Sequence, residues 1–111
     1  MIGAPTPILR VSPAIDEKQR TKHRRYLAVY EMFDAVIDRW RWLRIMEQSS
    51  GEMKWEVILY VEDPVSARLI PMTIVIGADS NGSYNLVSMH RIDASRVRRM
   101  LRAGQLISGK G

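Results

Sequence analysis

The stretch that decides the fold class reads KWEVILYV and spans residues 54–61. Every second residue in it is a large apolar one, namely Trp55, Val57, Leu59 and Val61. Successive side chains of a β-strand point to opposite faces, so this period of two predicts a strand with one face in the core. Pro64 follows closely and ends the strand, because proline has no N–H for the hydrogen-bond ladder.

Three more segments have the composition of strands. They are residues 40–45, 70–76 and 84–91. Two turn signals separate them from their neighbours, Ser49-Ser50-Gly51 and the polar run 78–83. Short turns between successive strands require antiparallel pairing. We therefore expect a four-stranded antiparallel meander sheet.

A helical segment precedes the sheet. Residues 16–38 contain neither Pro nor Gly, and an apolar residue recurs at helical spacing, at Tyr26, Tyr30, Phe33 and Ile37. This pattern predicts one long helix or two short ones.

A second helical segment follows the sheet, where Asp93 is a suitable N-cap and Gly104 a suitable C′ residue. Its apolar positions, expected inside, are Val97, Met100 and Leu101, and its expected outer positions are Arg96, Arg98, Arg99 and Arg102. The fold expected from these elements is α+β, with the helices packed on one face of the sheet.

The length of 111 residues fits one hydrophobic core. We expect an extended arm over residues 1–15, which contain three of the five prolines, a single domain over residues 16–108 and a short tail at residues 109–111. No apolar run approaches the roughly 20 residues of a membrane span, so no membrane partner is expected. We expect the protein in the cytoplasm, or delivered into the cytoplasm of a target cell.

The charge of the chain favours a polyanionic partner. Its formal net charge is +5, its pI is about 10.0, and 13 of its 17 basic residues are arginine, the side chain suited to bidentate phosphate contacts. The basic residues expected to contact nucleic acid are Lys22, Arg24, Arg25, Arg41, Arg91, Arg96 and Arg99. The alternatives are that these residues simply form solvated helical faces, or that they dock an acidic protein.

Two histidines carry the candidate chemistry. By the period of two, His90 shares a strand face with Tyr84, Leu86 and Ser88. Together with His23 and Arg39, Ser88 and His90 offer the groups of a metal-free phosphodiesterase: a base for a ribose 2′-hydroxyl, an acid for the leaving oxygen, and fixed cations. The chain has no cysteine and only two histidines, so we expect neither a metal site nor another cofactor.

Several segments together resemble a nuclease superfamily. They are His23 in its basic segment, Asp38-Arg39-Trp40, residues 84–93, and the arginine-rich residues 96–102. In their order they resemble the small phage- and toxin-associated nucleases grouped with barnase, EndoU, the colicin tRNases and RelE, the BECR superfamily. The resemblance spans residues 21–107.

The resemblance implies a BECR-like fold and metal-independent cleavage of RNA, either tRNA or another RNA. It implies that His23 is the N-terminal catalytic group, that Arg39 or Arg41 stabilises the phosphate, and that Ser88 is the hydroxyl of the last strand. It also implies an immunity or antitoxin protein as a partner. An aromatic residue often occupies the position of His90 in that pattern, so the acid or base role of His90 follows from its chemistry alone. A non-catalytic nucleic-acid-binding module remains the alternative.

Overall fold

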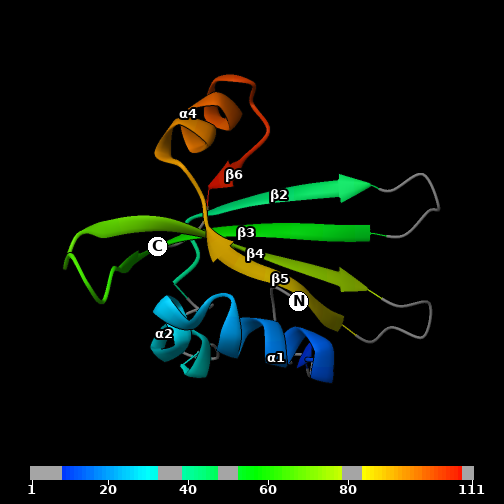
Figure 1. Cartoon of the computed structure of the whole chain (residues 1–111). Helices are drawn as coiled ribbons and strands as arrows, with labels where there is room; N and C mark the ends of the chain where they lie inside the picture. Colours follow the sequence, from blue (N-terminus) through cyan, green and yellow to red (C-terminus); the bar gives the residue numbers. More distant parts are fainter. Residues whose placement is uncertain (1–8, 33–38, 48–52, 79–83, 109–111) are drawn as a thin grey trace.

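The structure is a computed structural model that describes residues 9–32, 39–47, 53–78 and 84–108. Six strands form one sheet in the order β1-β5-β4-β3-β2-β6 (Figure 1). The strands are β1 Leu9–Arg10, β2 Trp42–Glu47, β3 Met53–Glu62, β4 Leu69–Ala78, β5 Tyr84–Arg91 and β6 Ile107–Ser108.

The sheet is mixed and larger than the four strands expected. β2, β3, β4 and β5 pair antiparallel with their neighbours, β6 adds antiparallel to β2, and β1 adds parallel to β5. The expectation of a four-stranded, wholly antiparallel sheet is therefore wrong. Each added strand has only two residues, too few to show any periodicity, and is defined by its hydrogen bonds to the edge of the sheet.

The helical segment before the sheet is divided into short pieces. α1 spans Pro13–Thr21, a 3-10 helix spans Arg24–Tyr26, and α2 spans Leu27–Glu31. α1 begins before the expected Asp16, because Ser12 accepts a hydrogen bond from the backbone N–H of Ile15 and proline fits the first helical turn. The expected core positions Phe33 and Ile37 lie outside the described residues, as do the turns at residues 49–51 and 79–83.

The last helix, α4, spans Ala94–Arg102. Val97 and Met100 are buried as expected, and Gly104 follows with a φ of 69°, a left-handed conformation that glycine adopts without strain. Leu101, which was expected inside, is 40% exposed, so that prediction is wrong. It lies one residue beyond Met100, about 100° further round the helix.

The helices cover both faces of the sheet, not one as expected. Tyr26 and Tyr30, from the first helical segment, belong to the main core with Val57 and Leu59. α4 packs against a second cluster built around Ile58. Because Ile58 lies between Val57 and Leu59 on β3, the two clusters occupy opposite faces. Figure 1 shows α1 and α2 below the sheet and α4 above it.

A β-bulge changes which residues of β5 share a face. Ser88 pairs with Val75, but Leu86 pairs with the next residue of β4, Ile76, so Val87 is an extra residue in β5. Leu86 therefore lies on the main-core face, as does Tyr84, whose ring packs against Trp55. The prediction that these two share a face with Ser88 and His90 is wrong. The bulge reverses the alternation at Val87.

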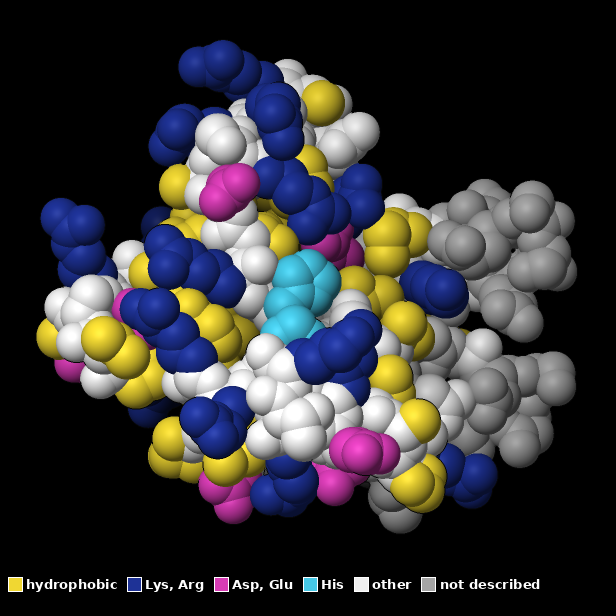
Figure 2. Space-filling model, viewed as in Figure 1, with side chains coloured by type: hydrophobic (Ala, Val, Ile, Leu, Met, Phe, Trp, Pro, Cys, Tyr) yellow, Lys and Arg dark blue, Asp and Glu magenta, His cyan; other side chains and the backbone are white. Residues whose placement is uncertain are grey.

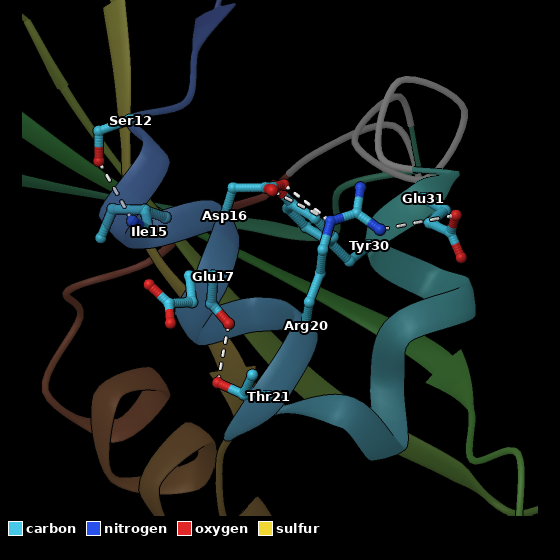
Figure 3. A network of polar contacts seen from close by, with 8 residues as sticks. All are labelled: Ser12, Ile15, Asp16, Glu17, Arg20, Thr21, Tyr30 and Glu31. Atoms are coloured by element: carbon cyan, nitrogen blue, oxygen red, sulfur yellow. Dashed lines mark hydrogen bonds and ion pairs between the residues drawn. The ribbon is translucent and has the colours of Figure 1, made fainter.

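A polar network holds α1 against α2 (Figure 3). The hydroxyl of Tyr30 donates a 2.6 Å hydrogen bond to Asp16, and Arg20 forms an ion pair with the same carboxylate at 3.0 Å. Arg20 also lies 3.9 Å from the carboxylate of Glu31. The network fixes the angle between the helices and so positions the turn between them, which carries His23.

Candidate functional site

The two histidines meet although they are far apart in the sequence. His23 lies in the turn between α1 and the 3-10 helix, and His90 lies near the end of β5. Their rings are stacked, with centroids 6.2 Å apart and an interplanar angle of 25°. The side chain of Gln19, buried on α1, donates a 2.9 Å hydrogen bond to the carbonyl of Met89 and holds α1 to β5 beside the pair.

Both rings favour the neutral form. Partial burial lowers the pKa of His23, and the charges of Lys18 and Lys22 lower it further. Burial also lowers the pKa of His90, followed by the charges of His23 and Arg96, with a smaller effect from Lys18 and a small opposing effect from Glu56. At neutral pH the pair therefore contains a ring nitrogen free to accept a proton, and protonation of either ring opposes protonation of the other.

Ser88 lies on the same face of the sheet as His90. The register pairs Ser88 with Val75 and His90 with Thr73, and these partners are two residues apart on β4. Both Ser88 and His90 are partly exposed. The expected common face of Ser88 and His90 is therefore present, because both residues follow the bulge.

A buried carboxylate, which sequence reasoning missed, lies at the centre of this face. Glu56 is 1% exposed and accepts a 2.6 Å hydrogen bond from the hydroxyl of Thr73. Arg44 on β2 and Arg96 on α4 each form an ion pair with it at 3.0 Å. In the sequence, Glu56 alternates with apolar residues, and this pattern predicts a side chain exposed to solvent. Its burial depends on α4, whose Arg96 pairs with it.

Cations surround the histidine pair on two sides. Lys18 and Lys22 come from α1 and the turn after it, and Arg96 comes from α4. Figure 2 shows the two histidines (cyan) at the surface, with Lys and Arg side chains above and below them. Lys22 and Arg96 were expected to contact nucleic acid, whereas Lys18 was missed.

Several expected site cations lie elsewhere. Arg39 and Arg41 precede β2, which is three strand positions from β5, or about 14 Å. The guanidinium of Arg41 lies over the ring of Trp42, and that of Arg25 forms a two-pronged ion pair with the buried Asp63. The register therefore does not bring Arg39, the expected catalytic cation, to the histidine pair.

The remaining expected contacts of nucleic acid are exposed. Arg24 adjoins His23, and Arg99 lies on α4. Arg91 adjoins His90 but pairs with Met72, a main-core residue, so it lies on the opposite side of the strand. Among the described residues, no three His, Asp or Glu side chains gather as metal ligands would.

Comparisons with known proteins identify no relative. No protein-family model matches the sequence, and searches of curated proteins and of solved structures gave no significant match. Within the described part of the chain, no helix has the length and apolar character needed to cross a membrane. The residues of the site therefore carry the functional argument.

Proposed function

We propose that the protein is a metal-independent endoribonuclease that uses His23 and His90 as its acid–base pair. The single observation that carries the proposal is the stacking of these rings at 6.2 Å. The pair joins the turn after α1 to the end of β5, and the lowered pKa of both rings keeps a neutral base available. The reaction is that of the BECR nucleases which the sequence resembles, although this fold differs from the expected one in its added strands and in the placement of α4.

The reaction needs two proton transfers at one phosphodiester. A neutral histidine removes the proton of the ribose 2′-hydroxyl, whose oxygen attacks the phosphorus. The other histidine, protonated, donates its proton to the 5′-oxygen as the P–O5′ bond breaks. The products are a 2′,3′-cyclic phosphate and a 5′-hydroxyl. The acid and base roles of His23 and His90 stay unassigned.

The groups around the pair suit the charge that develops on the phosphorane. Arg96, Lys18 and Lys22 supply positive charge, and fixed cations in such a place stabilise the transition state more than the ground state. The hydroxyl of Ser88, on the same face as His90, is placed to donate to a phosphate oxygen. RNA is the substrate class because the attacking group is its 2′-hydroxyl.

The test is cleavage of a labelled RNA oligonucleotide in the presence of EDTA. The expected result is a product ending in a cyclic phosphate, identified by mass, and no cleavage of the DNA of the same sequence. His23→Gln and His90→Gln should each lower the rate by about 100-fold or more, as expected for loss of a general acid or base. Intact RNA at high protein concentration would contradict the proposal.

A second candidate function has support from the same cations. A non-catalytic nucleic-acid-binding module would bind RNA without cutting it. Binding of a 2′-deoxy oligonucleotide, measured by fluorescence anisotropy for the native protein and both glutamine variants, separates the two functions. Binding by all three proteins without cleavage by the native protein would select the binding module.

A further inference from the structure

The sheet face that carries Ser88 and His90 is basic beyond the histidine pair. The register places Arg44 opposite Glu56, Glu56 opposite Val75 and Val75 opposite Ser88, in one row across four strands. The row nearer the β2–β3 turn contains Met46, Lys54 and Gly77. The stem of Lys54 lies across Gly77, with its Cγ 3.9 Å from the position of a Cβ there.

The buried acidic charge on this face, that of Glu56, is already neutralised. Glu56 is buried between two guanidinium groups. The other acidic residue of β3 on this face, the exposed Glu62, lies at the far end of the strand, beyond Ile58 and away from Lys54. The trio of Glu56, Arg44 and Arg96 has a net charge of +1, because two cations share one carboxylate. A buried carboxylate that pairs with two arginines fixes both of them in place.

Arg44 keeps part of its surface open although Glu56 holds it. Its side chain is 26% exposed and that of Arg96 is 35% exposed. A guanidinium has five N–H donors, so contact with Glu56 leaves donors for a second anion. α4 covers the end of this face around Ile58 and Trp42. Arg44 and Lys54 lie further along the strands, away from that cluster.

We propose that Arg44, together with Lys54, binds the phosphates of nucleotides beyond the scissile bond, so that the RNA strand lies across the sheet from β5 towards β2. The proposal rests on the proposed nuclease function for the position of the scissile bond. Glu56 is then a positioning residue: it holds Arg96 near the reacting phosphate and Arg44 under the flanking ones. The ligand is a single strand, which can follow a row of separate cations.

The test compares two substrates that differ in the number of phosphates. A dinucleoside monophosphate has only the scissile phosphate, whereas an RNA hexamer has flanking phosphates as well. Arg44→Ala and Lys54→Ala should each lower kcat/KM for the hexamer about tenfold relative to the dinucleotide, the loss of one charge-assisted contact. Arg68→Ala, which removes the same charge in the β3–β4 turn, is the control and should leave this ratio unchanged.

The outcomes separate the two proposals. If Arg44→Ala and Lys54→Ala lower kcat/KM equally for both substrates, or for neither, the proposed phosphate subsite is overturned. Lys54→Ala keeps the test decisive if Arg44→Ala does not fold, because Lys54 is not among the hydrogen-bond and ion-pair partners of Glu56. If the native protein cuts neither substrate, the nuclease proposal fails. The subsite is then tested by binding of a 2′-deoxy hexamer, and unchanged affinity of both variants relative to Arg68→Ala overturns it.

Discussion

The protonation of the histidine pair, His23 and His90, affects the free energy of unfolding. Both rings have a pKa below the ordinary value of 6.5, chiefly because they are partly buried. The unfolded chain therefore binds more protons than the folded chain at pH values between 6.5 and the lowered pKa. The stability contributed by the neutral pair is complete above pH 6.5 and is lost as the pH falls through the folded-state pKa.

We expect the free energy of unfolding to decrease as the pH falls below 6.5, measured by urea denaturation at fixed salt down to about pH 5. The carboxylates with lowered pKa, Asp16 and Asp63, take up protons in the unfolded chain from about pH 5 downwards, so they contribute little above that pH. His23→Gln should reduce the decrease, because it removes one titrating group and its repulsion of His90. A decrease of the same size in this variant would contradict the assignment.

Glu56 shows how one buried residue joins three elements. Its carboxylate binds Thr73 on β4, Arg44 on β2 and Arg96 on α4. Glu56→Ala removes the acceptor and leaves two guanidinium groups without their counter-charge. We expect a loss of about 3–5 kcal/mol in the free energy of unfolding. Glu56→Gln keeps an acceptor for Thr73, and urea denaturation should show a smaller loss than for Glu56→Ala.

At the scale of elements, α4 is held by few apolar residues. Met100 is 5% exposed and packs in the cluster around Ile58, whereas its neighbour Leu101 is 40% exposed. We expect Met100→Ala to cost about 2–5 kcal/mol, because it leaves a cavity between helix and sheet. Leu101→Ala, the matched control, should change stability by no more than about 0.5 kcal/mol. Similar losses in thermal and urea unfolding for both variants would contradict this packing.

The bulge in β5 determines which side chains of the strand share a face with His90. If Val87 continued the regular alternation and β5 had no bulge, Ser88 and His90 would share their face with Tyr84 and Leu86. The bulge instead gives the core Tyr84 and Leu86 and leaves the outer face to Ser88 and His90. The sequence contains no signal for the bulge, because Tyr84, Leu86, Ser88 and His90 already fit one regular alternation.

At the scale of the whole molecule, the net charge of +5 acts through a few placed cations. The two proposals together use Lys18, Lys22, Arg44, Lys54 and Arg96. For a single strand each neutralised phosphate contributes about 0.7 to the magnitude of the slope of log affinity against log salt, so these five cations predict a slope of about −3.5. Lys18→Ala should reduce the magnitude of the slope by about 0.7. Anisotropy titrations of a 2′-deoxy oligonucleotide at several salt concentrations measure it, and a slope near zero would contradict phosphate binding.

The periodicity of residues 54–61 and of the flanking segments indicated β-strands, and the helical spacing of Tyr26 with Tyr30 and of Val97 with Met100 indicated which helix residues are buried. These features depend on neighbours along the chain, which is why the sequence determined them. It also indicated His23, Ser88 and His90 as candidate residues for acid–base chemistry, without showing that they come together.

The tertiary structure alone decided the rest. It placed α4 on the opposite face from α1 and α2, added β1 and β6 at the edges, and brought His23 to His90. It placed Arg96 and Lys18, and not Arg39, beside the histidine pair, and it buried Glu56 between two arginines. All of these features have one physical reason, because each depends on contacts between segments that are distant in sequence. Hydrogen bonding at the sheet edges and charge pairing under α4 select the partners, and local periodicity does not encode them.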